Sequence, residues 1–309
     1  MASPHVEVIG PTTLLGEAPH WDADRQVLYY VDINSSTVNK YDPATKKVST
    51  AQIEGGIVNF IIPVDGKKDQ FAINVGRHLS VLTWDGESSV PTKVETVVSV
   101  EDGTNNSFND GKADPTGRLW SGTIGPIEKT LELGPLQKIG KLYSITNGQA
   151  PVCHVTNIHI SNGLTWSPDG KTMYYIDSMS RKVDAFNFDA ASGLISNRRT
   201  AFDFEINGVK GYPDGMTVDT EGNLWVACLG GSKVIRVDPT AGKLVSAVDF
   251  PCPQVTCPAF GGPQLDELYV TTGVLALSED DKRKYPISGS TFRVTGLGAK
   301  GFAGTHVKL

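Results

Sequence analysis

Oxygen-bearing side chains recur at similar places along this chain, and together they could hold a metal ion. Glu17, Asn162 and Asp214 would supply two carboxylates and one amide carbonyl if they converged. An all-oxygen set of this kind suits hard cations such as Ca²⁺, Mg²⁺ or Mn²⁺. Three protein ligands leave coordination positions for water or substrate, and an ion with open positions can polarise a carbonyl group and activate water.

A repeated fold is needed to bring such distant residues together, and the chain contains a repeat. A turn built on Asp or Gly, an apolar strand, a polar gap and a second apolar strand recur six times, roughly 45 to 55 residues apart, which is the range of propeller blades. The apolar strands that follow the turns include residues 27–32, 71–75, 119–120, 173–176, 224–227 and 268–270. The repeat predicts an all-β protein, a six-bladed β-propeller with a central metal-binding channel, formed by residues 1–309 as a single domain.

The polar side chains lie in the segments that precede each repeat. We expect these segments to be loops that open onto one end of the channel, because Asn-Gly and Asp-Gly are common turn sequences. Their corresponding positions in successive repeats argue for a shared site. The segments are 15–19 (LGEAP), 58–60 (VNF), 107–111 (SFNDG), 160–163 (ISNG) and 212–215 (YPDG).

A propeller must also join its first and last blades. The extended segment 6–9 near the N-terminus could pair with residues 291–294, which would cover two exposed strand edges.

Composition narrows the choice of partners. The net charge is −6, and Lys and Arg form no basic block, which argues against nucleic acid or an anionic membrane as partner. The N-terminus lacks the pattern of a signal peptide, and four cysteines without a CxxC pair are typical of a reducing compartment. We therefore expect a cytoplasmic protein with a small-molecule substrate; the oligomeric state stays open.

Other motifs are weaker. Residues 296–301 match the dinucleotide pattern GxGxxG, but no helix-forming segment follows them. Residues 110–114 resemble the start of an EF-hand loop without its spacing or its closing Glu. No GxSxG motif is present, which argues against a serine hydrolase.

Several longer stretches resemble one known family. The sequence is similar to the family of regucalcin (senescence marker protein), bacterial gluconolactonases and insect luciferin-regenerating enzymes, over essentially the whole chain and most closely to the last of these. The stretches that carry the resemblance are 16–21 (GEAPHW), 108–115 (FNDGKADP), 160–164 (ISNGL), 211–216 (GYPDGM) and 294–301 (VTGLGAKG).

The resemblance implies a six-bladed propeller with one divalent cation, Ca²⁺ in the first place, with Mn²⁺, Mg²⁺ or Zn²⁺ as alternatives. Glu17, Asn162 and Asp214 match the family's metal ligands, and Asn109 matches a residue that contacts substrate beside the metal. Asp214 also matches a general base toward water. Asp110 is either an accessory acid–base residue or a residue that holds a tight turn.

Two positions depart from the family pattern. Ser107 stands where regucalcin-like members have a substrate-binding Arg, and Ile127 stands near the place of a substrate-binding Glu. Each lost charge-assisted hydrogen bond would remove roughly 1.5–3 kcal/mol of binding free energy. With Phe60 and Phe108 beside Ile127, the expected mouth is apolar and suits a flatter, more aromatic substrate than a sugar.

Three functions are compatible with these residues. The leading hypothesis is a metal-dependent hydrolase of a lactone or related cyclic ester, with Asp214 as base. The alternatives are a luciferin-regenerating enzyme that acts on oxyluciferin, and a non-catalytic calcium-binding regulatory protein.

Overall fold

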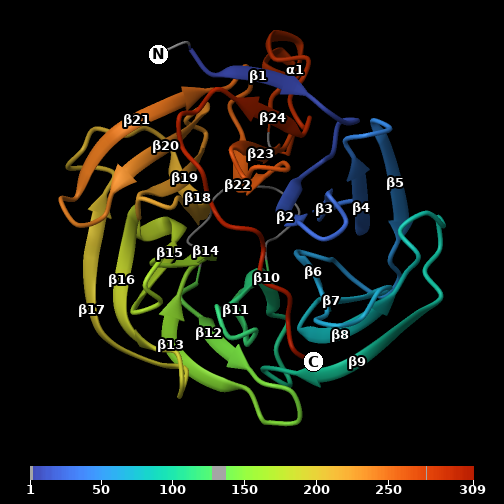
Figure 1. The fold of residues 1–309 in the computed structure, drawn as a ribbon. Coiled ribbons are helices and arrows are strands. Elements are labelled where there is room, and N and C mark those ends of the chain that lie inside the picture. Colours follow the sequence, from blue (N-terminus) through green and yellow to red (C-terminus); the bar gives the residue numbers. More distant parts are fainter. Residues whose placement is uncertain (1–2, 127–136, 276) are drawn as a thin grey trace.

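Six four-stranded antiparallel sheets surround a common axis in the computed structural model, which describes residues 3–126, 137–275 and 277–309 (Figure 1). We number the sheets as blades 1 to 6 in chain order. Blade 1 consists of β2 (Gly16–Asp22), β3 (Val27–Asp32), β4 (Thr37–Asp42) and β5 (Lys47–Gln52). Blade 2 consists of β6 (Ile61–Pro63), β7 (Gln70–Val75), β8 (His78–Thr83) and β9 (Lys93–Ser99). Blade 3 consists of β10 (Ser107–Ala113), β11 (Leu119–Ile124), β12 (Gly140–Ile145) and β13 (Val152–Ile158).

Blades 4 and 5 repeat this order, and blade 6 takes one strand from the N-terminus. The predicted all-β propeller of six blades is therefore confirmed. Blade 4 consists of β14 (Ser161–Trp166), β15 (Thr172–Asp177), β16 (Lys182–Asp189) and β17 (Leu194–Asp203). Blade 5 consists of β18 (Tyr212–Val218), β19 (Leu224–Leu229), β20 (Lys233–Asp238) and β21 (Lys243–Asp249). Blade 6 consists of β22 (Val255–Gly261), β23 (Glu267–Thr272), β24 (Phe292–Thr295) and β1 (His5–Val8).

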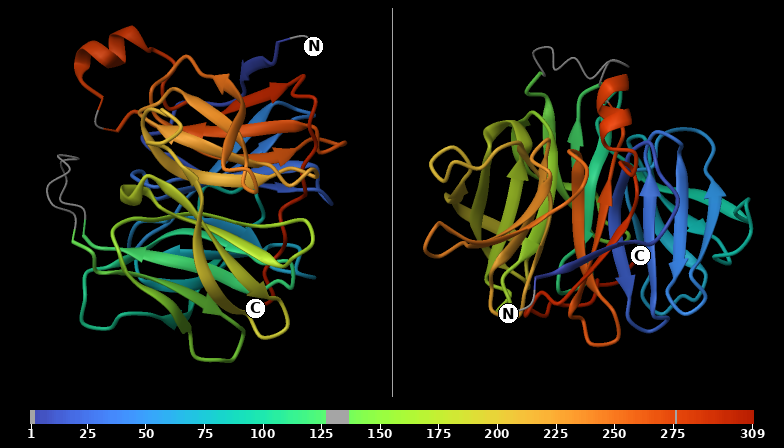
Figure 2. Two further views of the ribbon diagram at one scale, coloured as in Figure 1. Left: turned by 90° about the vertical axis from the view of Figure 1, so that its left-hand side faces the viewer. Right: turned by 90° about the horizontal axis from the view of Figure 1, so that it is seen from above.

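The ring closes by strand pairing between the two ends of the chain. β1 pairs with β24 in antiparallel register, with Val6 opposite Val294 and Val8 opposite Phe292. Figure 2 shows β1 lying beside the last blade. This confirms the predicted pairing of 6–9 with 291–294. Ile9 and Thr291 lie just beyond the two strands, and the Ile9 amide donates a 2.9 Å hydrogen bond to the Thr291 carbonyl.

Helical structure is confined to short connections in the described part of the chain. The 3₁₀ helix η1 (Ser178–Ser180) follows β15. The helix α1 (Glu279–Lys284) is capped at its N-terminus by Ser278, whose side chain accepts a hydrogen bond from the Asp281 amide. No described helix has the length and apolarity required to cross a membrane.

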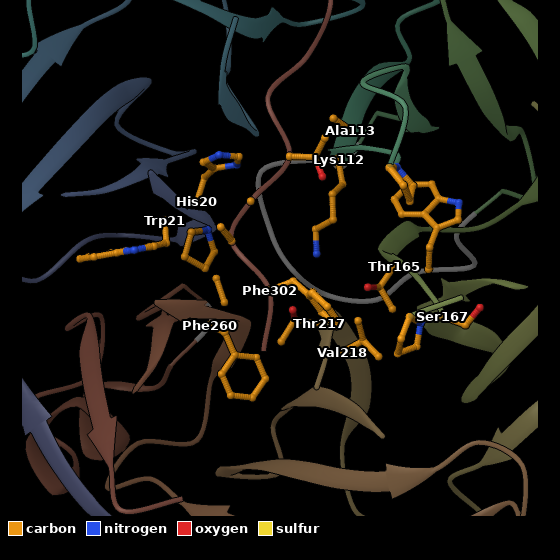
Figure 3. Close-up of a pocket in the computed structure, with 18 residues that line it drawn as sticks. His20, Trp21, Lys112, Ala113, Thr165, Ser167, Thr217, Val218, Phe260 and Phe302 are labelled. Carbon is orange, nitrogen blue, oxygen red and sulfur yellow. The ribbon is translucent and has the colours of Figure 1, made fainter. Parts of the chain in front are cut away.

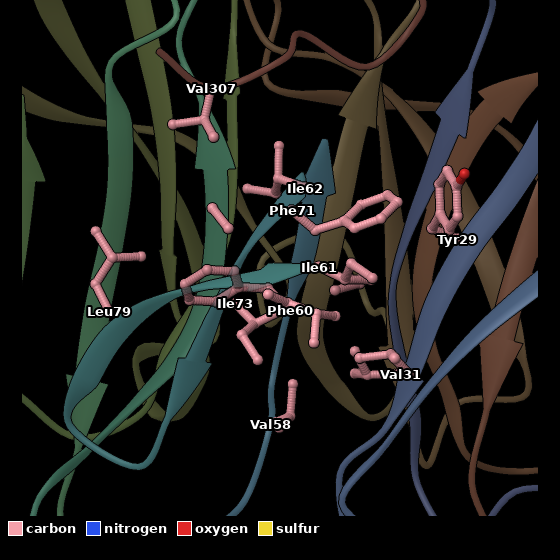
Figure 4. Packing of buried hydrophobic residues seen from close by; sticks show 14 of the residues in the cluster. Tyr29, Val31, Val58, Phe60, Ile61, Ile62, Phe71, Ile73, Leu79 and Val307 are labelled. Carbon is pink, nitrogen blue, oxygen red and sulfur yellow. The ribbon is translucent and has the colours of Figure 1, made fainter. Parts of the chain in front are cut away.

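Apolar strands pack blade against blade. Every residue of β3, β11 and β23 is buried, because each of these strands is covered on both faces by neighbouring blades. Tyr29 of blade 1 meets Phe71 of blade 2 edge-on, with ring centroids 4.8 Å apart (Figure 4). Such aromatic pairs contribute about 0.5–1.5 kcal/mol each beyond area burial, so side-chain packing between neighbouring blades adds to the strand pairing that closes blade 6.

The channel has two distinct ends because the first strand of every blade runs in the same direction. We call these strands, β2, β6, β10, β14, β18 and β22, the inner strands. The "near end" of the channel is the end at which they begin, and the "far end", across which the C-terminal segment runs toward the viewer in Figure 1, is the end at which they finish. Residues 301–307, the "C-terminal strap", cross the far end. Gly301 bridges to Asp219 after β18, and Val307 bridges to Val64 after β6.

Candidate metal and substrate site

The carboxylate and amide side chains named above lie at the near end of four inner strands. Glu17 lies in β2, Asp110 in β10, Asn162 in β14 and Asp214 in β18. The expectation that they lie in loops is wrong, since all four are strand residues. Asn59 alone lies in an irregular segment, which leads into β6.

Each of these strands is irregular at the functional residue. The pairing register shifts between Glu17 and His20 in β2, between Phe108 and Gly111 in β10, and between Pro213 and Met216 in β18. β14 shifts between Asn162 and Leu164. A β-bulge inserts an extra residue and turns a side chain away from the regular alternation. The repeated bulge therefore aims these side chains along the channel.

Backbone strain accompanies the bulge in β2. Ala18 has a φ of 47°, a left-handed conformation that is unfavourable for a residue with a Cβ atom. Its amide donates a 2.9 Å hydrogen bond to the Glu17 carboxylate. This local contact fixes the direction of the Glu17 side chain.

Glycine follows three of the four residues because neighbouring inner strands approach closely there. A Cβ atom on Gly163 would lie 2.6 Å from the Asp214 carbonyl oxygen, and one on Gly215 would lie 2.2 Å from Cys257 Sγ. These separations are too short for any side chain. The glycines thus bring blades 4, 5 and 6 together around Asn162 and Asp214.

The carboxylates of the site are buried without a cationic partner. Glu17 and Asp214 are 9% and 5% exposed. Burial, and then the charges of Asp214 and Asp110, raises the pKa of Glu17 well above its usual range. Burial and the charge of Asp110 likewise raise the pKa of Asp214, so these side chains lie near one another.

Asp110 belongs to the same cluster but has a different neighbour. Burial raises the pKa of its carboxyl group, while the charge of Lys112 acts in the opposite direction. Within residues 3–126, 137–275 and 277–309, no Lys, Arg or His forms an ion pair with Glu17, Asp110 or Asp214. A buried charge without a partner is costly.

Asn162 supplies the amide group of the predicted metal-ligand set. Its Nδ2 donates to Ser178 Oγ at 3.0 Å, and a hydrogen bond from its side chain counteracts the raised pKa of Asp214. In the described part of the chain no group of three or more His, Cys, Asp or Glu side chains could hold an ion by itself. Two carboxylates and one amide oxygen nevertheless fit a hard cation, whose charge would offset the repulsion.

A cavity of about 680 Å³ lies at the near end. Ser107 and Asn109 line it, together with apolar residues that include Leu15, Ile57 and Ile124. Asn109 joins the cavity wall to the buried cluster, because its Oδ1 accepts from Asn59 Nδ2 at 3.2 Å and its Nδ2 donates to the carbonyl that precedes Asn162 at 2.8 Å. Asn109 is thus the contact between the cavity and the predicted ligands, since Glu17, Asn162 and Asp214 do not themselves line the cavity, and the roles of all these residues stay predictions.

The two phenylalanines expected at the mouth lie in the core. Phe60 is fully buried and packs edge-on against Phe108, which is also buried. Phe60 fills the space left by the absent side chain of Gly111, 2.7 Å from where a Cβ would lie. The expectation that Phe60 lines the mouth is therefore wrong. Ile127 lies outside the described residues, directly after Pro126 of the cavity wall.

A further set of side chains that position the site was not predicted from the sequence. Asp32, Asn74 and Asp177, each near the end of the second strand of its blade, accept hydrogen bonds from the backbone that leads into the inner strand. Asp177 accepts from the amides of residues 159 and 160 at 3.1 Å. Asp32 accepts from residues 14 and 15 at 2.9 and 3.0 Å, and Asn74 from Asn59 at 2.7 Å. Their equivalent places in the repeat were the signal that could have identified them.

The sequence and the fold are similar to those of known proteins over nearly the whole chain. The model of the SMP-30/Gluconolactonase/LRE-like region matches residues 15–274. The chain belongs to this family. Regucalcin of Xenopus laevis is 40% identical over 307 residues, which cover 99% of both chains.

Two solved structures extend the comparison. A luciferin-regenerating enzyme has a TM-score of 0.93 and 46% identity, over 99% of this chain and 100% of the other. A regucalcin from Agrobacterium tumefaciens, described as a calcium-binding protein, has a TM-score of 0.87 and 27% identity over the full length of both chains. Membership of the SMP-30/gluconolactonase/LRE-like family favours lactone hydrolysis and a small-molecule substrate over the other functions of propellers.

Proposed function

We propose that this protein hydrolyses a lactone or a related small cyclic ester with the help of one divalent cation, Ca²⁺ in the first place. Glu17, Asn162 and Asp214 would hold the ion. The observation that carries the proposal is the burial of Glu17 and Asp214 side by side with Asp110, without an ion-pair partner in the described residues. A cation would remove the repulsion that otherwise favours protonation of these carboxyl groups.

Different residues would carry out the separate steps of lactone hydrolysis. When bound, a divalent cation supplies polarisation of the lactone carbonyl. Asp214 accepts a proton from the attacking water, whose oxygen bonds to the carbonyl carbon while the ring C–O bond breaks. Asp110, whose burial favours its protonated form, donates a proton to the departing ring oxygen, so that the product is a hydroxy acid.

Asn109 would position the substrate next to this group. Its hydrogen bonds to Asn59 and to the carbonyl of Ser161 hold its amide in one orientation at the cavity wall. Ser107, also in that wall, offers a hydroxyl in place of a charged donor. Leu15, Ile57 and Ile124 give the remaining wall a large apolar share beside Arg77, whose guanidinium pairs with Asp102, and this share favours an apolar lactone over a sugar lactone.

A panel of lactones tests the proposal. Hydrolysis of gluconolactone and of alkyl-substituted γ-lactones would be followed by pH-stat with chelated protein and with protein reloaded with Ca²⁺, Mn²⁺ or Zn²⁺. We expect turnover that depends on the metal, prefers the apolar lactones and disappears in Asp214→Ala. Asp24→Ala, which removes an exposed carboxylate in a hairpin, should retain the activity. Metal-loaded protein that hydrolyses no lactone would contradict the proposal.

Luciferin regeneration is the second candidate. The 46% identity to a luciferin-regenerating enzyme and the apolar cavity wall favour a flat substrate such as oxyluciferin. Product analysis after incubation with oxyluciferin separates the two activities. Stoichiometric Ca²⁺ binding without turnover of either substrate would instead indicate a calcium-binding regulatory protein.

A further inference from the structure

A second cavity lies at the far end of the channel, away from the site described above. Its volume is about 380 Å³, toward the lower end of the range for small-ligand pockets. The ends of inner strands β2, β10, β14, β18 and β22 form its wall, and residues 302–305 of the C-terminal strap lie across it. None of Glu17, Asn162 and Asp214 lines this cavity.

Lys112 separates this cavity from the carboxylate cluster. Its Nζ donates a 2.7 Å hydrogen bond to the carbonyl oxygen of Met216. Because Lys112 belongs to blade 3 and Met216 to blade 5, the side chain crosses the channel (Figure 3). An ammonium group carries three N–H donors, and no carboxylate of the described residues lies within ion-pair distance of it. Its charge acts on Asp110 from a distance, and the N–H groups that Met216 does not use are available to an anion.

His20 supplies a second polar group. It is 8% exposed and lines the cavity, and its Nε2 has no hydrogen-bond partner in the described part of the chain. Burial, and then the charge of His306, lowers the pKa of His20 to about 3, so the imidazole is neutral and can donate one N–H. A buried polar atom without a partner carries a cost that a ligand atom would remove.

The rest of the wall is mostly apolar and aromatic. Trp21, Trp166, Phe260 and Phe302 line the cavity, and Figure 3 shows Lys112, Thr165 and Thr217 directed toward its middle. One cationic group and a few hydroxyls within an aromatic wall are the features of a pocket for a small amphipathic anion. A charged ligand without a flat apolar body would leave that wall exposed to water.

We propose that the far-end cavity binds a small organic carboxylate with a flat apolar body, whose oxygens pair with Lys112 and His20. The residues that line it are distinct from Glu17, Asn162 and Asp214, although Lys112 lies near enough to Asp110 for their charges to interact. The C-terminal strap covers part of the cavity, because Gly304 lies directly against the His20 ring, at a place where a Cβ would approach the ring atoms to 2.4 Å.

Titration of benzoate into chelated protein tests the proposal, with binding read by calorimetry and by the fluorescence of Trp21 and Trp166. We expect saturable binding of benzoate and at least about tenfold weaker binding of benzamide, its neutral counterpart. Lys112→Met, which keeps the apolar stem, should weaken benzoate binding about tenfold or more. Lys171→Met, at an exposed lysine, should leave it unchanged.

Two further variants serve as a control at the other site and as a replacement for Lys112→Met. Asp214→Ala should bind benzoate as the wild type does, because the two sites are separate. If Lys112→Met does not fold, His20→Leu together with Thr165→Val, which removes two polar groups of the wall, should weaken benzoate binding in its place. The proposal is overturned if benzoate does not bind, if benzamide binds equally well, or if the Asp214→Ala substitution abolishes binding.

Discussion

The side chains of Glu17, Asp110 and Asp214 lie buried together, and their chemistry follows from that placement. Burial and mutual repulsion raise the pKa values of Glu17 and Asp214. The folded metal-free protein therefore holds protons that the unfolded chain releases. This linkage makes its stability fall as the pH rises through the raised pKa values.

Glu17→Gln should separate repulsion from metal binding. In chelated protein at pH 8 the variant should be more stable than the wild type by about 1 kcal/mol or more, since one unit of pKa shift corresponds to about 1.4 kcal/mol. The gain should shrink toward low pH, where Glu17 itself is protonated. Thermal denaturation with and without Ca²⁺ should show that the variant has lost the stabilisation by Ca²⁺.

A matched control for this experiment is Glu54→Gln, at an exposed position. It should change neither the melting temperature nor the effect of Ca²⁺. A Glu17→Gln protein that Ca²⁺ stabilises as strongly as the wild type would remove Glu17 from the ligand set.

His154 should make the fold sensitive to acid. Its ring stacks on Trp120 with centroids 4.4 Å apart, and burial lowers its pKa to about 4. Between pH of about 6.5 and 4 the unfolded chain binds a proton that the folded protein excludes, so the free energy of unfolding falls as the pH falls. Urea denaturation should show a loss on the order of 1–2 kcal/mol across this range.

His154→Phe keeps the aromatic stack on Trp120 and removes the imidazole that titrates. Its stability should depend less on pH over the same interval, whereas His5→Phe, at an exposed residue of β1, should follow the wild type. Equal pH dependence in His154→Phe and wild type would assign the acid sensitivity to other groups.

At the scale of the strands, the bulges explain which predictions from the sequence succeeded. The strands that follow the repeat turns were predictable from their apolar runs, and 27–32 is β3 as expected. Asn162-Gly163 and Asp214-Gly215 have the sequence of a turn but lie within strands. Their local sequence fits both structures, and the approach of the next inner strand, which no local pattern records, decides between them.

Phe60 is another residue whose position could not be predicted from the local sequence. A phenylalanine beside a polar residue at the start of a strand could face either the channel or the core. Contact with Gly111 of the neighbouring blade places it in the core. By contrast, Glu17, Asn162 and Asp214 could be proposed as a group because equivalent positions of a repeat lie at the same end of a propeller.

Gly163→Ala should damage the site through the backbone. Its Cβ would meet the Asp214 carbonyl oxygen at 2.6 Å, so blades 4 and 5 would have to separate. We expect a loss of about 1–3 kcal/mol in the free energy of unfolding and weaker Ca²⁺ binding by calorimetry. Gly66→Ala, in a distant hairpin with φ of 69° and open space around it, should lower stability without changing Ca²⁺ affinity.

At the scale of the whole molecule, closure of the ring and the strap define the two ends of the channel. The pairing of β1 with β24 completes blade 6, and the strap joins blades 5 and 2 across the far end. The closure was predictable from the extended segment at residues 6–9. The path of the strap was not, because residues 301–307 carry no strand pattern of their own.

Deletion of residues 1–8 should open blade 6 and expose the edge of β24. We expect a loss of at least about 2 kcal/mol in stability, since Val6 packs against the apolar cluster between blades 5 and 6, and a broader thermal transition. Val8→Ser, a substitution at an exposed residue of the same strand, should have little effect. A truncated protein that unfolds like the full chain would show that side-chain packing alone closes the ring.

Calorimetric titration of Ca²⁺ into chelated protein tests most directly whether the near end of the channel is a metal site. The wild type should bind one ion per chain, and Asn162→Ala should lose that binding while retaining its fold. Asn39→Ala, which removes a similarly buried amide far from the channel, should bind one ion as the wild type does. Undiminished Ca²⁺ binding by Asn162→Ala, or no binding by the wild type, would contradict the metal site.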